Sequence, residues 1–209
     1  MEHADGMEFT DAVRRRRMIR NYDPDRAVPR AVLDELLDLA VHAPSAGYTQ
    51  GWRFLVLDDA TSCADFWAAT TDADGEPDPW LSRMRTAPAL IVCFSDKEAY
   101  LDRYAEPDKG WTDRDEARWP VPFWHIDAGM AAMILLLGAT DRGLGACFFG
   151  VPRPYWDALR QAFAVPERLV PVGVVSLGHP APDVRSPSLR RGRRPRAEVV
   201  AYGRFGALG

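Results

Sequence analysis

The sequence lacks the motifs that identify several large enzyme classes. It contains no GxGxxG after an expected strand, no Walker A sequence and no HExxH zinc motif. Ser45 does not lie in a GxSxG context, so the nucleophile elbow of a hydrolase is absent. Asp127 and Asp141 are fourteen residues apart on one expected helix, about 21 Å along its axis. That separation is too long for the paired carboxylates of a glycosidase.

Cysteine and histidine are also scarce, with three and four residues respectively. None of them has the spacing of a metal site, so we predict no metal. An odd number of cysteines without a CxxC pair indicates reduced thiols, and the polar start of the chain lacks a secretory signal. We therefore expect a cytoplasmic protein. The residues concerned are Cys63, Cys93, Cys147, His3, His42, His125 and His179.

Long hydrophobic runs and a strong charge imbalance are missing as well. The apolar segment 128–140 has thirteen residues between two aspartates, whereas a membrane span needs about 20. We expect a helix there that is buried on most sides, and no membrane partner. The net charge of −4 argues against nucleic-acid binding. With 209 residues, 47% of them hydrophobic, the chain is expected to form a single domain over 1–209, with 1–6 disordered.

Hydrophobic periodicity predicts alternating helices and strands. Helices are expected over 8–17, from Pro29 to before Pro44, and over 61–70, 80–85, 96–104, 125–142 and 153–163. Strands are expected over 52–57, 89–94, 145–149 and 169–177, with a last short strand over 199–202. This order predicts an α+β fold, a three-layer α-β-α sandwich around a mixed central sheet. The tail after Gly178 cannot bury its own apolar residues, so we expect it to wrap a second subunit of a homodimer.

The segment 105–122 is polar and contains prolines, yet it carries Trp111 and Trp119, and Phe123 and Trp124 follow directly. Loops of this length in a compact domain are usually functional or disordered, and the tryptophans argue against disorder. Two interpretations remain open. The segment is either a lid over a pocket, or a loop docked on its own core or on a partner subunit.

Two arginine clusters lie near opposite ends of this acidic chain. Like charges at this density repel each other, so each cluster needs an anionic partner unless it is fully solvated. Guanidinium groups suit phosphate oxygens through paired hydrogen bonds. A solvated helix face with a basic tail, or one shared anionic ligand, would both explain the pattern. The clusters are Arg14, Arg15, Arg16, Arg17 and Arg20, and Arg185, Arg190, Arg191, Arg193, Arg194 and Arg196.

Three further segments share a recognisable order and spacing. The first is Arg-Arg-Met-Ile-Arg-Asn-Tyr over 16–22, and the second is Ala-Pro-Ser-Ala-Gly-Tyr-Thr-Gln-Gly-Trp over 43–52. The third consists of 176–180, 191–195 and 198–200 near the end of the chain. Together they resemble the nitroreductase superfamily of flavoproteins over nearly the whole chain. The resemblance implies a nitroreductase-like fold and a homodimer that binds FMN at its interface.

The resemblance also implies roles for individual residues. Arginines of the first motif and of the tail would hold the phosphate and ribityl chain of FMN. The Pro44–Ser45 loop would lie beside the flavin ring, Gln50 would support the ring, and backbone groups near Phe149 and Gly150 would contact it. The implied cofactor-binding residues are Arg16, Arg17, Met18, Arg20, Pro44, Ser45, Gln50, Phe149, Gly150, Arg191 and Arg193.

Three residues depart from the family pattern. Met18 stands where the family usually has a small hydroxyl residue, so a side-chain hydrogen bond to the cofactor would be lost. Tyr48 replaces the usual asparagine, and Gly51 replaces a proline, which would loosen the turn before the next strand. This form of the loop also resembles the flavin-fragmenting benzimidazole synthase branch, whose catalytic residues have no match here.

The function implied by the resemblance is transfer of hydride from NAD(P)H to FMN, followed by reduction of a flat acceptor such as a nitroaromatic or a quinone. Such a reaction would be ping-pong and needs no side-chain acid or base, so no catalytic residue is assigned. Trp111, Trp119, Phe123 and Trp124 are the expected lining of the substrate pocket. The alternatives are another flavin reaction, namely oxygen-dependent dehydrogenation or flavin fragmentation, binding of a flavin or deazaflavin without turnover, and an anion-binding protein without flavin.

Overall fold

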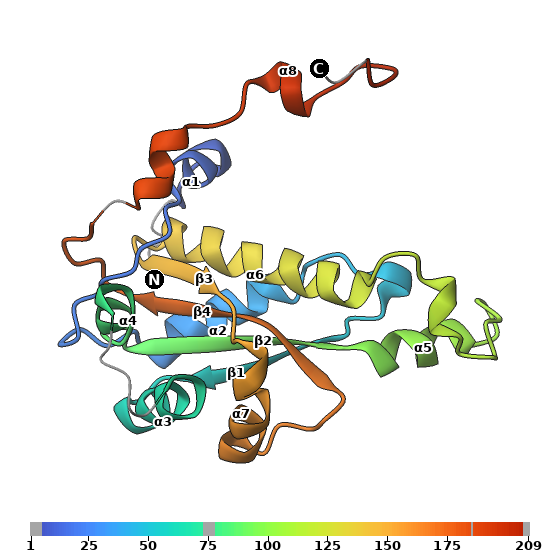
Figure 1. The fold of residues 1–209 in the computed structure, drawn as a ribbon, viewed down its shortest axis with the longest axis horizontal. Helices are drawn as coiled ribbons and strands as arrows, with labels where there is room; N and C mark the ends of the chain where they lie inside the picture. The colour runs from blue at the N-terminus through green and yellow to red at the C-terminus, as the bar shows by residue number, and fades with distance from the viewer. Residues whose placement is uncertain (1–5, 73–77, 185, 207–209) are drawn as a thin grey trace.

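A computed structural model describes residues 6–72, 78–184 and 186–206. Its centre is a four-stranded sheet with the order β1-β2-β4-β3 (Figure 1). Of the expected disordered segment 1–6, residues 1–5 lie outside the described part, as does Arg185 of the second arginine cluster. The strands are β1 Trp52–Leu57, β2 Ala89–Asp96, β3 Gly145–Phe149 and β4 Leu169–Gly178.

The prediction of a mixed sheet is wrong, because all three strand pairings are antiparallel. Two helices, α3 (Ala60–Thr70) and α4 (Pro79–Met84), separate β1 from β2. The chain therefore re-enters the sheet at the end where β1 left it, and Leu57 of β1 faces Leu90 of β2. A single crossover helix would have returned the chain to the opposite end and given a parallel pair. The only parallel pairing among the described residues is an isolated bridge between Met18 and Ala146.

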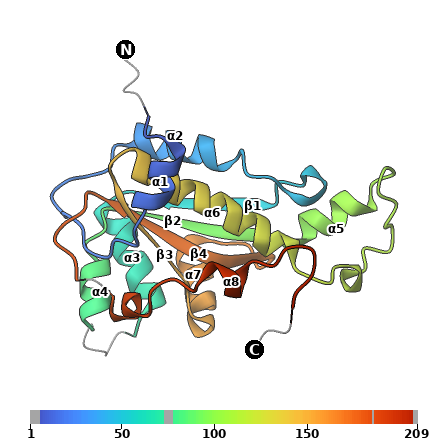
Figure 2. The same ribbon diagram turned by 90° about the horizontal axis from the view of Figure 1, so that it is seen from above.

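Helices cover both faces of the sheet, as the three-layer prediction requires. On one face lie α2 (Arg30–Ala40) and α6 (Phe123–Asp141), and Figure 2 shows α6 lying across the strands. On the other face lie α3 and α7 (Trp156–Phe163). Successive side chains of a strand point to opposite faces, so alternate side chains of β2 belong to the two cores on either side of the sheet. Ile91 and Cys93 join the core with α2 and α6, whereas Leu90 and Val92 join the core with α3 and α7.

The remaining elements are short and surround this sandwich. The α-helices are α1 Phe9–Arg15, α5 Lys97–Ala105 and α8 Arg196–Val199, and the 3₁₀ turns are η1 Ala46–Tyr48, η2 Glu116–Arg118, η3 Arg153–Tyr155 and η4 Pro187–Arg191. The predicted strand over 199–202 is wrong, since α8 occupies its start. A strand needs a neighbouring backbone with which to pair, and no described residue outside 199–202 forms such a ladder with it. Figure 1 shows the tail running away from the body.

The central helix α6 has one uncovered face. By length and composition it could cross a membrane, but half of the relevant window is buried in the fold. It packs on the sheet and α2, yet Ile126, Met130 and Met133 are 39%, 38% and 45% exposed. The expectation that this helix is buried on most sides is therefore wrong for the single chain, because no described element covers that face.

Candidate functional site

The first arginine motif lies beside the start of the tail. The backbone N–H of Ile19 donates to Ala146 of β3 at 2.9 Å, which ties the motif to the edge of the sheet. Two residues later the direction of pairing changes. The N–H of Ala181 donates to the carbonyl of Asn21 at 3.1 Å, and that of Asp23 donates to His179 at 2.9 Å. The first and third motifs of the sequence thus meet within one chain.

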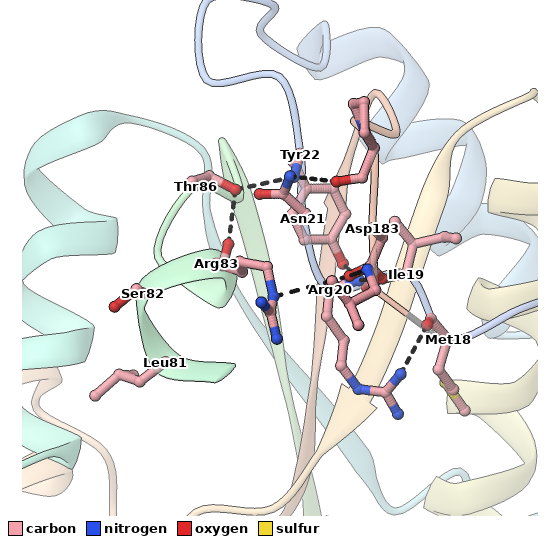
Figure 3. A network of polar contacts seen from close by, with 12 residues as sticks. Met18, Ile19, Arg20, Asn21, Tyr22, Leu81, Ser82, Arg83, Thr86 and Asp183 are labelled. Carbon is pink, nitrogen blue, oxygen red and sulfur yellow. Dashed lines mark hydrogen bonds and ion pairs between the residues drawn. The ribbon is translucent and has the colours of Figure 1, made fainter. Parts of the chain in front are cut away.

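Asp183 joins this segment to α4. Its carboxylate accepts a hydrogen bond from the backbone N–H of Arg20 at 3.0 Å and lies 3.9 Å from Nε of Arg83. Figure 3 shows the side chain of Arg83 directed towards Asp183, whereas the guanidinium group of Arg20 points to the carbonyl of Met18, to which it donates at 3.0 Å. Sequence reasoning missed Arg83, because a lone arginine on a short helix gives no signal in the pattern. The structure adds it to the arginines near the N-terminal motif.

Two guanidinium nitrogens of this region are buried without a hydrogen-bond partner among the described residues: Nη1 of Arg16 and Nε of Arg83. A buried N–H group without an acceptor costs about 1–3 kcal/mol, and more when the group is charged. An anionic ligand that accepts from these groups would satisfy them. Burial raises the pKa of the Cys147 thiol, and the charges of Arg20 and Arg16 oppose that rise. Both arginines therefore act on the same side chain of β3.

Arg17 and Met18 have local partners in the single chain. Nη1 of Arg17 donates to the carbonyls of Arg14, Arg15 and Arg16 at 2.6, 3.2 and 3.0 Å. These bonds close the C-terminal end of α1. Met18 packs against both halves of the core, and its sulfur accepts from the N–H of Phe148 at 3.4 Å. The loss of the family's hydroxyl group is thus accompanied by apolar packing on β3.

The Pro44–Gln50 loop has a tightly turned backbone. Oγ of Ser45 accepts a hydrogen bond from the N–H of Gln50 at 2.9 Å, which closes the loop on itself. Gly47, Tyr48 and Gln50 have positive φ angles of 62°, 55° and 53°. For the two residues other than glycine, such a backbone costs of order 1–3 kcal/mol each and needs support from its surroundings. Pro44 and the side chain of Gln50 are exposed, so both are available for contact with a ligand.

A cleft opens where β3 ends. Phe149 stacks on Trp67 with ring centroids 5.5 Å apart and meets Trp80 edge-on at 5.8 Å. Phe149 and Gly150 line this cleft of about 330 Å³ together with residues of α3 and α4. One of these residues is Leu81 of α4, the helix that also carries Arg83. The predicted contacts at Phe149 and Gly150 therefore lie at a hollow surface.

The four aromatic residues of the predicted substrate pocket gather in one cluster. Trp119 lies at its centre, with ring centroids 5.6 Å from Trp111, 5.8 Å from Trp124 and 6.1 Å from Phe123. In this structure the 105–122 segment is docked on the protein's own α5 and α6, which is one of the two interpretations that the sequence left open. Phe123 is exposed (36%), Trp111 and Trp119 are half-buried, and Trp124 is buried (6%), so Phe123 has the most accessible of the four rings. Their assignment to a substrate pocket stays a prediction.

The tail arginines are not brought to the first motif in the single chain. Arg191 and Arg193 are exposed, and neither has a hydrogen bond or ion pair within the described ranges. Of the arginines considered for the phosphate site, Arg20 and Arg83 both meet Asp183, and the assignment of Arg16 and Arg20 to the phosphate stays a prediction. The contribution of Arg191 and Arg193 depends on where the tail lies in an assembly.

Known proteins resemble this chain in sequence and in fold. The sequence profile described as "Nitroreductase family" matches residues 13–179. A Bacillus subtilis protein provisionally named an NAD(P)H nitroreductase is 43% identical over 83% of this chain and 89% of its own length. A Methanothermobacter thermautotrophicus protein provisionally named an NADH dehydrogenase/NAD(P)H nitroreductase is 32% identical over 86% and 83%. A crystal structure from Desulfovibrio desulfuricans, provisionally named a nitroreductase and complexed with FMN, is 29% identical, with a TM-score of 0.68, over 96% of this chain and 99% of that one. The chain belongs to the nitroreductase family.

Proposed function

We propose that this protein is an FMN-dependent oxidoreductase that takes hydride from NAD(P)H and reduces a flat organic acceptor, such as a nitroaromatic or a quinone. The observation that carries the proposal is that two buried guanidinium nitrogens, Nη1 of Arg16 and Nε of Arg83, have no hydrogen-bond partner among the described residues, although Asp183 lies 3.9 Å from the second. Guanidinium groups of this kind suit a phosphate group. The FMN in the Desulfovibrio desulfuricans relative and the names of the other two relatives support the choice of cofactor and donor.

In this proposal the chain binds and orients the cofactor, and FMN supplies the two-electron redox chemistry. The arginines hold the phosphate, the turned loop lies beside the ring, and the end of β3 offers backbone groups to it. NAD(P)H and the acceptor occupy the same pocket in turn, which gives ping-pong kinetics. Phe123 is the accessible aromatic residue for a flat acceptor. The proposed cofactor contacts are Arg16, Arg17, Met18, Arg20, Arg83, Pro44, Ser45, Gln50, Phe149, Gly150, Arg191 and Arg193.

We also propose a homodimer in which the tail wraps the partner subunit. The uncovered face of α6 continues onto α1, where Phe9 and Val13 are 72% and 44% exposed. In the tail, Tyr202 and Phe205 are 80% and 74% exposed. Apolar surface of this extent is typical of an interface rather than of a monomer. Wrapping would also carry Arg191 and Arg193 to a phosphate that Arg16 and Arg20 hold.

A cytoplasmic location forms part of the same proposal. Cys63, Cys93 and Cys147 are free and buried, and burial raises the pKa of all three thiols. Reduced, unreactive thiols suit a reducing compartment. Fractionation of the cells that produce the protein tests this expectation, and recovery in an extracellular or periplasmic fraction would contradict it.

A spectrum of the purified protein with added FMN tests the proposed function, followed by anaerobic titration with NADH and with NADPH. We expect bound oxidised flavin to give an absorption band at about 450 nm. At least one of the two donors should bleach this band, and a nitroaromatic or a quinone should restore it. Binding without bleaching would favour a flavin-binding protein without turnover. Absence of any flavin binding would overturn the proposal, and new flavin-derived products in air would indicate fragmentation instead.

A further inference from the structure

The Pro44–Gln50 loop is held from behind by two helices. Asp127 of α6 is 2% exposed, and its Oδ2 accepts two hydrogen bonds. One comes from the backbone N–H of Ala46 at 2.9 Å, and the other from the hydroxyl group of Tyr100 on α5 at 2.7 Å. Nε of Arg103, also on α5, donates to the carbonyl of Gly47 at 2.9 Å. Asp127 and Arg103 thus bond the backbone of a segment that carries three positive φ angles, and Tyr100 bonds Asp127.

Two aromatic rings of α5 contact the same loop at its glycines. A Cβ atom added to Gly51 would lie 2.3 Å from Cε2 of Tyr100, and one added to Gly47 would lie 2.7 Å from Cε2 of Tyr104. Both distances are far below van der Waals contact. A side chain at position 51 would meet the Tyr100 ring, so the glycine that stands in place of the family's proline admits this ring beside the loop. The hydroxyl group of the same ring donates to Asp127.

The 105–122 segment supports these rings in turn. Trp119 lies 5.9 Å from Tyr100 and 4.6 Å from Tyr104, and Trp111 lies 4.9 Å from Tyr104. Arg114 pairs with Glu98 and Asp102 of α5 at 2.7 and 3.0 Å. The segment packs on the two tyrosines that contact the loop, so its tryptophans are joined to the loop through α5.

We propose that Asp127 is a positioning residue that sets the backbone of the Pro44–Gln50 loop for the flavin ring; this inference rests on the proposed function. Its carboxylate is the acceptor for the N–H of Ala46 at the start of the turn and is fixed by Tyr100. Loss of the carboxylate leaves a buried N–H and a buried hydroxyl group without an acceptor. The positive φ angles then lose the surroundings that maintain them, and the loop relaxes away from the geometry that faces the ring.

The test compares four variants by two readouts. Amide hydrogen exchange of the peptide covering 44–50 is measured in the FMN-free protein, and FMN affinity with the visible circular dichroism of the flavin is measured in the loaded protein. The variants are Asp127→Ala, Asp127→Asn, Tyr100→Phe and the control Ala139→Gly. Ala139 lies on the same helix, about 18 Å along the helix axis from Asp127, and is fully buried. Its replacement weakens α6 by an amount typical of glycine in a helix.

We expect Asp127→Ala to speed exchange in the loop at least tenfold, to weaken FMN binding about tenfold, which equals about 1.4 kcal/mol, and to alter the flavin dichroism. Asp127→Asn should restore most of both properties because its amide oxygen can still accept both hydrogen bonds. Tyr100→Phe should give an intermediate two- to fivefold change, roughly what loss of a single hydrogen bond implies. Ala139→Gly should lower the thermal midpoint and change neither readout.

Unchanged exchange over 44–50 in Asp127→Ala would overturn the inference, as would equal effects in Ala139→Gly. If Asp127→Ala does not fold, Tyr100→Phe decides, and wild-type exchange together with wild-type dichroism in that variant overturns it. Failure of the wild-type protein to bind FMN would refute the proposed function instead. In that case the exchange measurement still decides whether Asp127 positions the loop.

Discussion

Replacement of Arg16 by methionine is expected to move cofactor affinity and protein stability in opposite directions. In the chain without ligand, Nη1 of Arg16 is buried and has no hydrogen-bond partner among the described residues. Methionine has a similar length and no N–H group, so it removes a buried group whose lack of a partner costs about 1–3 kcal/mol. The FMN-free variant should therefore be at least as stable as the wild type. Its thermal midpoint should rise by about 2–4 °C for each kcal/mol that is gained.

The same change should weaken FMN binding. A hydrogen bond to a charged group contributes about 1.5–3 kcal/mol, so the dissociation constant should rise roughly 10- to 150-fold. Quenching of FMN fluorescence on titration measures the affinity, and thermal denaturation without FMN measures the stability. Arg15→Met is the matched control, since the Arg15 side chain is 66% exposed and pairs only with Asp11. We expect it to change the affinity less than twofold.

Two results would refute this reasoning about Arg16. An affinity within twofold of the wild type would show that its guanidinium group does not meet the phosphate. A loss of several degrees in the thermal midpoint of the FMN-free variant would show that Arg16 has a structural partner in the protein. The two assays are independent, so each half of the argument can fail alone.

Three further predictions concern stability and assembly. Gly51→Ala should destabilise the fold by about 1–3 kcal/mol through overpacking against Tyr100, and an unchanged thermal midpoint would contradict the close approach. Burial raises the pKa of Cys63 to about 11 and of Cys93 to about 12 from an ordinary value of 9.0. The thiols ionise at lower pH in the unfolded chain than in the folded protein, so the free energy of unfolding should fall from about pH 9 towards pH 12. Each thiol contributes a fall of up to about 1.4 kcal/mol per pH unit. Denaturant unfolding at several pH values should show a shallower fall in Cys93→Ala than in the wild type. Met133→Asp should convert the proposed dimer to a folded monomer in light scattering, and an unchanged mass would place the interface elsewhere.

The elements of the sheet could be predicted from the sequence because each strand is a short apolar run between clear breakers. The prediction for β1 matches its bounds, Trp52–Leu57, and β2 begins where predicted but continues beyond the predicted end at 94 to Asp96. Strand direction could not be predicted in the same way. Whether β2 runs parallel or antiparallel to β1 depends on how α3 and α4 lie between them, and hydrophobic periodicity carries no information about that arrangement.

Residues of the candidate site were predictable only where they lie within a motif. Arg16 and Arg20 belong to a recognisable run, whereas Arg83 stands alone on α4 and is brought to them by the fold. In the sequence, Asp127 stands out only as the boundary of an apolar helix and as one of two aspartates that lie too far apart to act as a carboxylate pair. One signal was available, since a carboxylate at the start of a helix that is expected to be buried must find donors. The sequence could not show that those donors are Ala46 and Tyr100.

The tail shows why the positions of Arg191 and Arg193 relative to the proposed phosphate site could not be predicted from a single chain. Residues of a monomer that are both apolar and exposed must be solvated at a cost or covered by another surface. The tail and the α6 face both present such residues, and Arg191 and Arg193 of the same tail have no hydrogen-bond or ion-pair partner in the part of the chain that the structure describes. A second subunit would resolve both features together, because covering Tyr202 and Phe205 fixes the path of the arginines that precede them. If the dimer forms while the tail stays solvated, the tail arginines cannot belong to the phosphate site, and Arg16, Arg20 and Arg83 must bind the anion alone.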